Sequence, residues 1–408
     1  MAAGNRGLLK SREKERFQMT RFYLIRHAQA EGNLYQRMHG WYNSGVTQLG
    51  ERQIAALTGR FDHIQVDAVY SSDLYRCRRT AEAVYLHKGL PLHTHPGLRE
   101  LKVGIWEDWP FAQVAQEAPG EWQKFLTMDP TYIGAEGGET FAQLQRRVVT
   151  ALKEIQKAHP QETVAVCTHG MAIRAALAYF HGYGLELSRV PRSENTGVSC
   201  VDWDGERATV VYEADVSHLP LEIHSATAEK SVYSGRQMLP LGERCLWFRP
   251  WKPEEERSLY YAYRHEAWVD IHGSGVPFYG EQFYQVASKA SRNNPESVML
   301  AMLREDIVGI IQMDLQRDAE QGVCFVPFCY MDPEHRHKGM GVQLLGQAVS
   351  TARRLGRDKV HLRCAPTNQV AKRFYGRNGF HVLGMAPDSE VALELLEKPV
   401  VLTPPLDT

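Results

Sequence analysis

The chain has 408 residues, a length for which we expect two or three domains. Hydrophobic residues make up 43% of it and charged residues 23%, as is ordinary for a soluble globular protein. The formal net charge of −1 gives no electrostatic reason to expect nucleic acid or an anionic membrane as a partner, and no apolar run reaches the roughly 18 residues of a membrane span.

The seven cysteines are scattered along the sequence, and several lie in apolar, strand-like runs. This pattern predicts reduced thiols and a cytoplasmic location, not a disulfide framework. Two pairs of histidines, at 93/95 and 335/337, have no Cys or carboxylate at ligand spacing. We therefore expect no metal site there.

The first expected strand follows a polar N-terminal stretch. Residues 1–18 carry many charges and few apolar side chains, so we expect a disordered leader, with the folded protein beginning near Met19. Residues 22–25 form an apolar run typical of a buried parallel strand. The run ends at Arg26 and His27, and strands of open α/β sheets bind ligands at this end. An imidazole can attack phosphorus, and a guanidinium can bind phosphoryl oxygens through paired hydrogen bonds.

Strands and helices alternate through the rest of the first half. We expect strands over 66–72 and 163–168, a hairpin of 198–203 and 208–213, and helices over 47–60, 74–87 and 171–181, with a longer amphipathic helix beginning near Thr140. This alternation predicts a three-layer α/β/α domain with a mostly parallel sheet. Residues 105–135 predict an aromatic-rich helical insertion, which would be either a small satellite core or a wall of the substrate pocket.

Reactive side chains stand at the ends of several of these segments. Arg76 follows the strand over 66–72, and Glu100 lies in the stretch 98–101. His169 follows the strand over 163–168 and precedes a glycine that opens a helix. Together with Arg26 and His27, these are the groups that phosphoryl transfer through a phosphohistidine needs.

From about Met19 to Leu219 the chain resembles the histidine phosphatase (phosphoglycerate-mutase-like) superfamily. The matching motifs are Arg26-His27 with Asn33, residues 46–50, residues 72–76 with Thr80-Ala81, Leu98-Arg99-Glu100 with residues 104–107, residues 137–140, and Thr168-His169-Gly170. One departure is Ala28, where the family usually has Gly.

The resemblance implies a role for each matching residue. His27 would be the nucleophile, and Glu100 would protonate the leaving alcohol and then activate water. Arg26, Arg76, His169 and Asn33 would hold the phosphoryl oxygens. Thr47 and Trp106 are further candidates for substrate contact, and Arg174 is a candidate for supporting the site. His169 follows His27 by 142 positions, a spacing that resembles the compact phosphatases, whereas the mutases carry extra sequence between the two histidines. We therefore favour a phosphatase acting on a small-molecule phosphomonoester, with a phosphomutase as the alternative.

A linker separates this half from a second pattern of elements. Periodicity is lost over roughly 220–240, and we set the domains at 19–222 and 241–400, with a linker over 223–240 and a tail over 401–408. The linker offers few groups for an apolar interface, so we expect each half to fold alone. The second half predicts strands over 246–249, 298–303, 307–315, 322–331, 359–364, 380–384 and 391–396, helices between 254 and 291, and helices over 340–355 and 368–377.

A basic, glycine-containing turn precedes the helix over 340–355. Arg336, His337, Lys338, Gly339, Met340 and Gly341 follow a strand, and the glycines let the backbone present N–H groups at the positive end of a helix dipole. This arrangement is typical of a pyrophosphate cradle.

With Asn368 and the residues through Phe380, this turn makes residues 241–397 resemble the GNAT-type N-acetyltransferase family. The resemblance implies a mixed α/β sheet with splayed central strands, acetyl-CoA as co-substrate and an amine acceptor. The pantetheine would lie between Phe328, Tyr330 and Met331 on one strand and residues 359–364 on the other. Tyr375 matches the tyrosine that often protonates the departing thiolate. No residue stands out as the base, and Asp332 is one candidate. A non-catalytic module that senses acyl-CoA and regulates the phosphatase is the alternative to an acetyltransferase.

Overall fold

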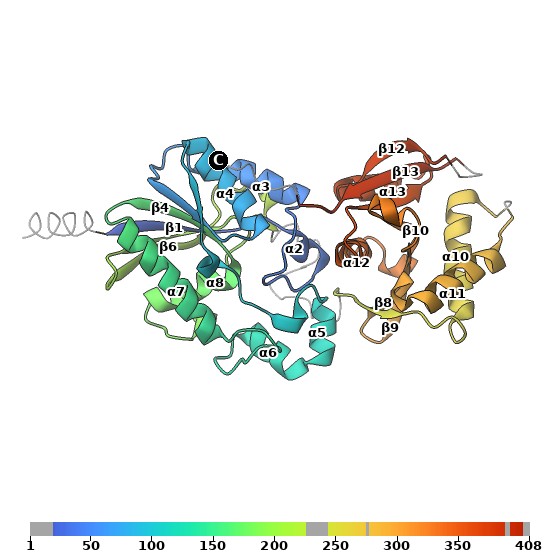
Figure 1. Ribbon diagram of the computed structural model, residues 1–408, viewed down its shortest axis with the longest axis horizontal. Coiled ribbons are helices and arrows are strands. Elements are labelled where there is room, and N and C mark those ends of the chain that lie inside the picture. The colour runs from blue at the N-terminus through green and yellow to red at the C-terminus, as the bar shows by residue number, and fades with distance from the viewer. Residues whose placement is uncertain (1–18, 226–243, 275–276, 388–391, 403–408) are drawn as a thin grey trace, which may run out of the picture.

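The computed structural model describes residues 19–225, 244–274, 277–387 and 392–402, which form two α/β halves (Figure 1). The expected leader, most of the expected linker and most of the expected tail lie outside these residues, so the domain boundaries stay predictions. The strands of the first half are β1 (Thr20–Arg26), β2 (Ala68–Ser71), β3 (Leu92–Thr94), β4 (Thr163–Thr168), β5 (Val198–Trp203) and β6 (Ala208–Asp215). Its helices are α2 (Glu31–Tyr35), α3 (Gln48–Arg60), α4 (Tyr75–Lys88), α5 (Phe111–Glu117), α6 (Pro119–Thr127), α7 (Phe141–Ala158) and α8 (Gly170–Phe180).

The first sheet has six strands in the order β3-β2-β4-β1-β5-β6. The first four are parallel to one another, and β5 and β6 run antiparallel at one edge. Alternate side chains of β1 point to opposite faces: Phe22 and Leu24 join a core with α7 and α8, whereas Tyr23 and Ile25 join a core with α3 and α4. The predicted three-layer α/β/α architecture is confirmed.

Local sequence signals fix the ends of the helices around this sheet. The Thr47 side chain accepts a hydrogen bond from the N–H of Gly50 and begins α3, as predicted. Thr140 begins α7 through a reciprocal capping box with Gln143. The apolar stripe of α7 then packs on the sheet through Leu144, Val148, Leu152 and Ile155.

The second half is built on a seven-stranded sheet in the order β12-β13-β11-β10-β9-β8-β7. Its strands are β7 (Trp247–Pro250), β8 (Val298–Leu303), β9 (Asp306–Asp314), β10 (Val323–Met331), β11 (Lys359–Cys364), β12 (His381–Met385) and β13 (Glu394–Pro399). Its helices are α10 (Arg257–His272), α11 (Gly280–Asn293), α12 (Gly341–Arg354) and α13 (Gln369–Arg377).

The central strands of this sheet separate along their length. β10 and β11 are parallel and pair only from Val323 opposite Lys359 to Val326 opposite Leu362. Beyond Val326, β10 continues to Met331 paired with β9 on its other side. The predicted mixed sheet with splayed central strands is therefore confirmed.

The two halves meet where α2 packs against α12 (Figure 1). Tyr35 of α2 is buried in the hydrophobic core of the second half. A Cβ on Gly346 of α12 would lie 2.6 Å from the Cβ of Tyr35, so this close approach requires glycine. The interface that the structure describes is formed by α2 and α12 and not by the stretch that joins the halves. That each half folds alone stays a prediction.

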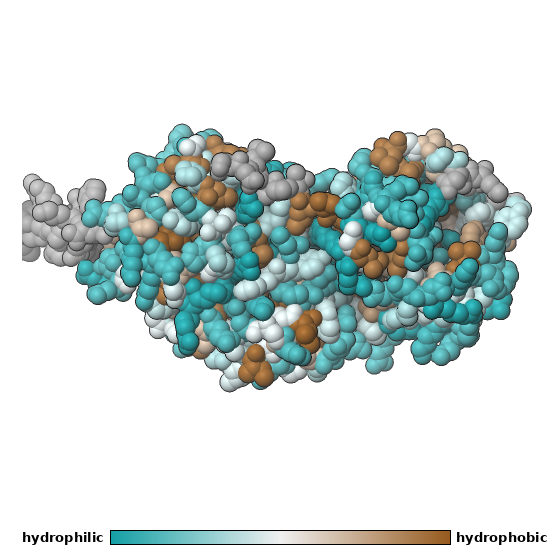
Figure 2. All heavy atoms as spheres, in the orientation of Figure 1, coloured by the Kyte–Doolittle hydropathy of each residue, from teal (hydrophilic) through white to brown (hydrophobic). Residues whose placement is uncertain are grey.

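The face of the molecule in Figure 2 is covered mostly by hydrophilic side chains, with small separate apolar patches on both halves. Within the described ranges, no helix has the length and apolar character needed to cross a membrane. All seven cysteines are free, and six of them are buried, in agreement with the predicted reduced thiols.

Candidate active site

A cavity of about 340 Å³ opens where β1 and β4 end, and its volume is in the range of about 300–1,000 Å³ typical of small-molecule sites. Six residues singled out from the sequence line it: Arg26, His27, Asn33, Arg76, Glu100 and Arg174. They come from four separate parts of the chain. The fold therefore brings together side chains that the sequence places up to 148 positions apart.

His27 lies directly after β1 and is only 6% exposed. Its Nδ1 lies 2.7 Å from the carbonyl oxygen of Ala28, and donation of a hydrogen bond to that oxygen fixes the proton on Nδ1. Burial, together with the charges of Arg76 and Arg26, holds the pKa of His27 well below its ordinary value. The imidazole is therefore neutral near pH 7, with the Nε2 lone pair available for attack.

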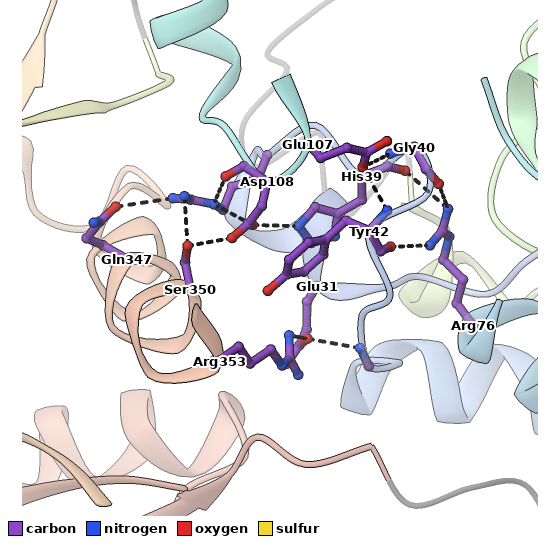
Figure 3. A network of polar contacts seen from close by, with 12 residues as sticks. Glu31, His39, Gly40, Tyr42, Arg76, Glu107, Asp108, Gln347, Ser350 and Arg353 are labelled. Atoms are coloured by element: carbon purple, nitrogen blue, oxygen red, sulfur yellow. Dashed lines mark hydrogen bonds and ion pairs between the residues drawn. The ribbon is translucent and has the colours of Figure 1, made fainter. Parts of the chain in front are cut away.

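Arg76, near the start of α4, is fully buried beneath a loop of the first half. Its guanidinium donates hydrogen bonds to the carbonyl oxygens of His39 (3.1 Å), Gly40 (2.7 Å) and Tyr42 (3.0 Å), as Figure 3 shows. These bonds hold the cation beside the cavity.

His169 lies immediately before α8 and, unlike His27, is not among the residues that line the cavity. The two imidazole rings are 5.2 Å apart between centroids and inclined at 61°. His169 is fully buried, and its Nε2 lies 3.0 Å from the Ser72 hydroxyl. Burial and the charge of Arg76 hold its pKa well below the ordinary value. His169 is therefore a second neutral imidazole next to His27.

Backbone groups fix the carboxylate of Glu100. One oxygen accepts a hydrogen bond from the N–H of Leu101 (2.8 Å), and the other accepts from the N–H of Met171 (3.1 Å) in the first turn of α8. A Cβ on Gly170 would lie 3.4 Å from the Arg26 Nε and 3.8 Å from the Glu100 carboxylate. Arg26 and Glu100 thus flank the same glycine at the start of α8.

The structure places the three remaining candidates of the first half differently. Asn33 lines the cavity, and its side-chain oxygen accepts a hydrogen bond from the N–H of Ala30. Thr47 is buried, donates to the Gln29 side chain at 2.7 Å and caps α3, so it does not line the cavity. Trp106 is 4% exposed and packs in the main core. Thr47 is explained by helix capping and Trp106 by core packing. Neither lines the cavity, so neither is retained as a substrate-binding candidate.

Further residues line the cavity, some of them in the insertion over 105–135 that the sequence predicts as a satellite core or a pocket wall. The insertion after Trp106 serves both as core and as cavity wall, because Phe111, Trp122 and Phe125 pack together and also line the cavity. Arg192 and Arg244 line it as well. Arg192 follows a proline in an irregular stretch and Arg244 lies next to the linker, so no periodicity marks either of them.

The basic turn of the second half has the geometry of an anion cradle. Gly339 has a φ of +77°, which glycine adopts without strain. Met340, the N-cap of α12, makes no side-chain capping bond in the described part of the chain, which leaves N–H groups of the first turn available to an anion. A Cβ on Gly341 would make only an ordinary contact with Phe374, at 3.7 Å. Around this turn Arg336 is half-buried, His337 and Lys338 are exposed, and Met340 is buried.

The splay between β10 and β11 is bordered by Tyr375. Burial, followed by the nearby thiols of Cys329 and Cys364, raises the pKa of Tyr375, so the phenol keeps its proton at neutral pH. Because these cysteines lie on β10 and β11, the tyrosine stands where the strands part. The chain thus fits a thioester ligand with its pyrophosphate at the start of α12 and its acyl end near Tyr375.

The other candidates of the second half have structural roles: one caps a helix, and three pack in the hydrophobic cores. The Asn368 side chain accepts a hydrogen bond from the N–H of Ala371 and caps α13. Phe328 and Tyr330 pack with α10 and α11 on one face of the sheet, and Met331 packs with α12 on the other. These side chains pack in the two cores. The edge of β10 that no longer pairs with β11 therefore offers a ligand mainly its backbone groups.

Asp332 follows β10 and accepts a hydrogen bond from the Tyr263 hydroxyl at 3.1 Å. Burial raises the pKa of Asp332, and the carboxylate of Glu266 contributes in the same direction. The hydroxyl of Tyr330 donates to Glu266. In the part of the chain that the structure describes, no three His, Cys, Asp or Glu side chains group in a way that could hold a metal ion.

Comparison with known proteins gives matches to both halves. Residues 22–216 match the family model of the histidine phosphatase superfamily (branch 1), and residues 247–380 match that of the acetyltransferase (GNAT) family. Over 208 residues the chain is 28% identical to the probable phosphoglycerate mutase GpmB of Yersinia pestis (strain Pestoides F), a match that covers 50% of this chain and 96% of that protein. Among solved structures, Bacillus stearothermophilus YhfR is 32% identical with a TM-score of 0.47, covering 49% of this chain and 98% of YhfR. The mycobacterial glucosyl-3-phosphoglycerate phosphatase is 24% identical with a TM-score of 0.44, covering 48% of this chain and 100% of that one.

Proposed function

We propose that this chain hydrolyses small phosphomonoesters through a phosphohistidine on His27. The chain contains a histidine phosphatase superfamily domain over residues 22–216 and a GNAT acetyltransferase domain over residues 247–380. The observation that carries the proposal is the hydrogen bond of 2.7 Å between the His27 Nδ1 and the Ala28 carbonyl oxygen. It leaves Nε2 unprotonated in a cavity that Arg26, Arg76 and Glu100 also line.

The first step forms the phosphoenzyme. The Nε2 lone pair of His27 forms a bond to phosphorus while the ester P–O bond breaks, and the electron pair of that bond leaves with the alcohol oxygen. Glu100 gives that oxygen its proton. Arg26, Arg76 and Asn33, which line the cavity, hold the phosphoryl oxygens as their charge develops, whereas His169 lies next to His27 outside the cavity lining.

The second step returns the enzyme to its starting state. Glu100, now a carboxylate, takes a proton from water as the water oxygen bonds to phosphorus. The P–N bond breaks, inorganic phosphate leaves, and His27 is again a neutral imidazole. The same carboxyl group serves in both steps because it borders the site of the departing alcohol and of the incoming water.

Substitution of the nucleophile tests the proposal. His27→Ala should remove nearly all hydrolysis of p-nitrophenyl phosphate. His87→Ala, at a histidine paired with Asp62 on the surface of the first half, is the matched control and should keep it. Retention of more than a few per cent of turnover by His27→Ala would show that His27 is not the nucleophile.

A phosphomutase is the second candidate for the first half, because the GpmB relative carries that name. The two activities differ in what receives the phosphoryl group from His27: water in a phosphatase, a second alcohol in a mutase. We favour the phosphatase on the spacing of 142 positions between His27 and His169. Incubation with a panel of phosphorylated sugars and acids, followed by assays for inorganic phosphate and for positional isomers, distinguishes them.

For the second half we propose transfer of an acetyl group from acetyl-CoA to an amine. The uncapped start of α12 and the left-handed Gly339 support pyrophosphate binding there. Acetyl-CoA, when bound, supplies an activated acyl group. Tyr375 is protonated and would supply the proton to the sulfur that leaves. Asp332, whose pKa is raised, is a candidate to take the proton from the amine.

The rival for this half is a module that binds acyl-CoA without catalysis and regulates the phosphatase. Calorimetric titration with acetyl-CoA, run beside an assay of acetyl transfer to a panel of amines, separates the two. Binding with transfer supports the enzyme, and Tyr375→Phe should then slow transfer without loss of binding. Binding without transfer to any amine favours the sensor.

A further inference from the structure

The loop over residues 36–45, which we call the Arg76 loop, forms part of the cavity wall and also supports Arg76. Its residues 36–40 line the cavity. Three of its carbonyl oxygens accept the hydrogen bonds of the Arg76 guanidinium. A guanidinium that donates to backbone carbonyls is oriented by that backbone. The conformation of this loop therefore determines where Arg76 presents its charge to a phosphoryl group.

The carboxylate of Asp108 fixes the start of the Arg76 loop. One of its oxygens accepts a hydrogen bond from the Arg37 Nε at 2.8 Å and lies 2.9 Å from the His39 Nε2. The carbonyl oxygen of Asp108 accepts a further hydrogen bond from the same Arg37 Nε at 2.7 Å. Arg37 is buried, and a buried charge that loses its partner is costly, so this pairing holds the two loop residues firmly.

Helix α12 of the second half supplies the other partners of this ion pair. The Ser350 hydroxyl donates to the second oxygen of Asp108 and accepts from the Arg37 Nη2 at 3.0 Å. The Arg37 Nη1 donates to the side-chain oxygen of Gln347 at 3.3 Å. Ser350 and Gln347 are both buried, so water has little access to replace either of them. A single hydroxyl of α12 thus bridges the two charges that fix the start of the loop.

The end of the Arg76 loop is fixed by a second carboxylate that α12 also holds. Glu31 accepts a hydrogen bond from the N–H of Gly45 at 3.0 Å and forms a buried ion pair with Arg353 of α12. Gln347, Ser350 and Arg353 follow one another at a spacing of three residues, so they lie on one side of the helix. In Figure 3 the loop lies between these side chains and Arg76. Helix α12 therefore holds both ends of a loop whose middle holds Arg76.

We propose that α12 positions Arg76 for phosphoryl transfer, so that Asp108 and Ser350 are positioning residues of the phosphatase and the second half of the chain completes the site of the first. The inference rests on the phosphatase function proposed above. Neither Asp108 nor Ser350 lines the cavity, and both act through the Arg76 loop. Acetyl-CoA is not needed for this role, because every contact in it lies within the chain.

Inhibition by orthovanadate tests the position of Arg76 separately from the amount of folded protein. Vanadate adopts a five-coordinate geometry similar to the transition state of phosphoryl transfer, so its affinity depends on cations that are correctly placed. An inhibition constant does not change with the concentration of active enzyme, whereas turnover per mass of protein does. The constant is measured against hydrolysis of p-nitrophenyl phosphate by the full chain.

Ser350→Ala and Asp108→Asn should each lower kcat/KM and raise the vanadate inhibition constant by about 10- to 100-fold, as misplacement of a charge by about 1 Å allows. The double variant should be no more than about twofold worse than the poorer single variant, because both substitutions break the same contact. Ser288→Ala is the matched control. Its hydroxyl is fully buried in α11 and has no hydrogen-bond partner among the described residues, so this variant should keep the constant of the unaltered chain.

A vanadate constant that Ser350→Ala or Asp108→Asn leaves within about twofold of that of the unaltered chain would overturn the proposal, even where turnover falls because less protein is folded. Losses that multiply in the double variant would overturn it as well. If the unaltered chain hydrolyses p-nitrophenyl phosphate and the constants do not change, only the role of α12 fails. If the unaltered chain does not hydrolyse it, the phosphatase proposal fails, and the role of α12 fails with it.

Discussion

The two candidate sites differ in what the chain itself supplies. In the first half, buried side chains from distant segments converge on one cavity, and His27, Arg76 and His169 are each less than a tenth exposed. In the second half, the proposed cradle would consist of backbone N–H groups at the start of α12 and a turn whose His337 and Lys338 are exposed. Transfer of a phosphoryl group to a side chain requires a nucleophile and cations held in place before substrate arrives. Binding of a pyrophosphate requires only a helix terminus that the ligand can approach.

The junction between the halves connects these two kinds of site. Asp108 accepts hydrogen bonds from Arg37 and from Ser350 of α12, and His39 Nε2 lies 2.9 Å from the same carboxylate (Figure 3). Glu31 of α2 forms a buried ion pair with Arg353 of α12 at 2.5 Å. The helix that begins at the cradle is therefore bonded to the loop that holds Arg76. The difference between the sites leads to four predictions, from the largest expected effect to the smallest.

Glu100→Gln tests whether the first site depends on a proton donor fixed in place. The substitution keeps the size of the side chain and removes its proton, so hydrolysis of alkyl phosphates should fall by ~10²–10⁴. p-Nitrophenyl phosphate needs little protonation of its leaving group and should lose much less. Steady-state kinetics with both substrates measures the difference. Equal losses would mean that Glu100 has a structural role.

Gly341→Asp tests whether the second site depends on the helix terminus alone. The new Cβ fits without a clash, and a carboxylate there would repel a pyrophosphate, so calorimetry should show acetyl-CoA binding weakened by roughly 100-fold. Gly59→Asp, at a helical glycine with open space around it, should bind acetyl-CoA normally. A several-fold change in phosphate hydrolysis by Gly341→Asp would support the sensor over an independent enzyme.

Gly346→Ala tests the contact between α2 and α12. The added methyl group would lie 2.6 Å from the Tyr35 Cβ, so we expect a loss of about 1–3 kcal/mol in the free energy of unfolding. Gly59→Ala, in the last turn of α3 with open space around it, should instead stabilise the chain by up to about 0.5–1 kcal/mol. Denaturant titrations measure both changes. An unchanged denaturant concentration at the midpoint of unfolding for Gly346→Ala would mean that this contact contributes little to the stability of the chain.

The lowered pKa of Asp108 leads us to expect that the stability of the chain depends on pH. Burial alone would raise its pKa, but the hydrogen bond from His39 and the charge of Arg37 outweigh burial and hold the pKa at about 2. Because this pKa is below the ordinary value, the unfolded chain binds the proton at a higher pH than the folded chain does. The ionised carboxylate therefore contributes roughly 2 kcal/mol to the free energy of unfolding. This contribution is fully present above about pH 4 and is lost as the pH falls toward 2. Asp108→Asn should be less stable than the unaltered chain at pH 7, and this difference should shrink over that interval.

Most of the fold could be predicted because its signals are local. Apolar runs marked the strands, Thr47 and Thr140 marked helix starts, and glycines at 339 and 341 marked the cradle. The residues that flank His27 could be predicted because motifs at strand ends meet at one edge of a parallel sheet. These features depend on neighbours in sequence or on the regular geometry of the sheet.

Features that depend on contacts between distant segments could not be predicted. The packing of Tyr35 on Gly346 joins positions more than 300 residues apart, and neither residue stands out in its own segment. Trp106 lies in a motif that the sequence linked to substrate, but its apolar surface is used in the core. Arg244 shows no periodic signal, and its place in the cavity depends on Gln343 of α12.

Trapping the phosphoenzyme tests the central claim most directly. Radiolabelled p-nitrophenyl phosphate is mixed with the full chain and quenched in alkali after milliseconds, and the labelled peptide is identified. We expect label on His27 that survives alkali and is lost in acid, as a phosphoramidate is, and no label in His27→Ala. Label on another residue, or turnover with no label at any quench time, would contradict the account.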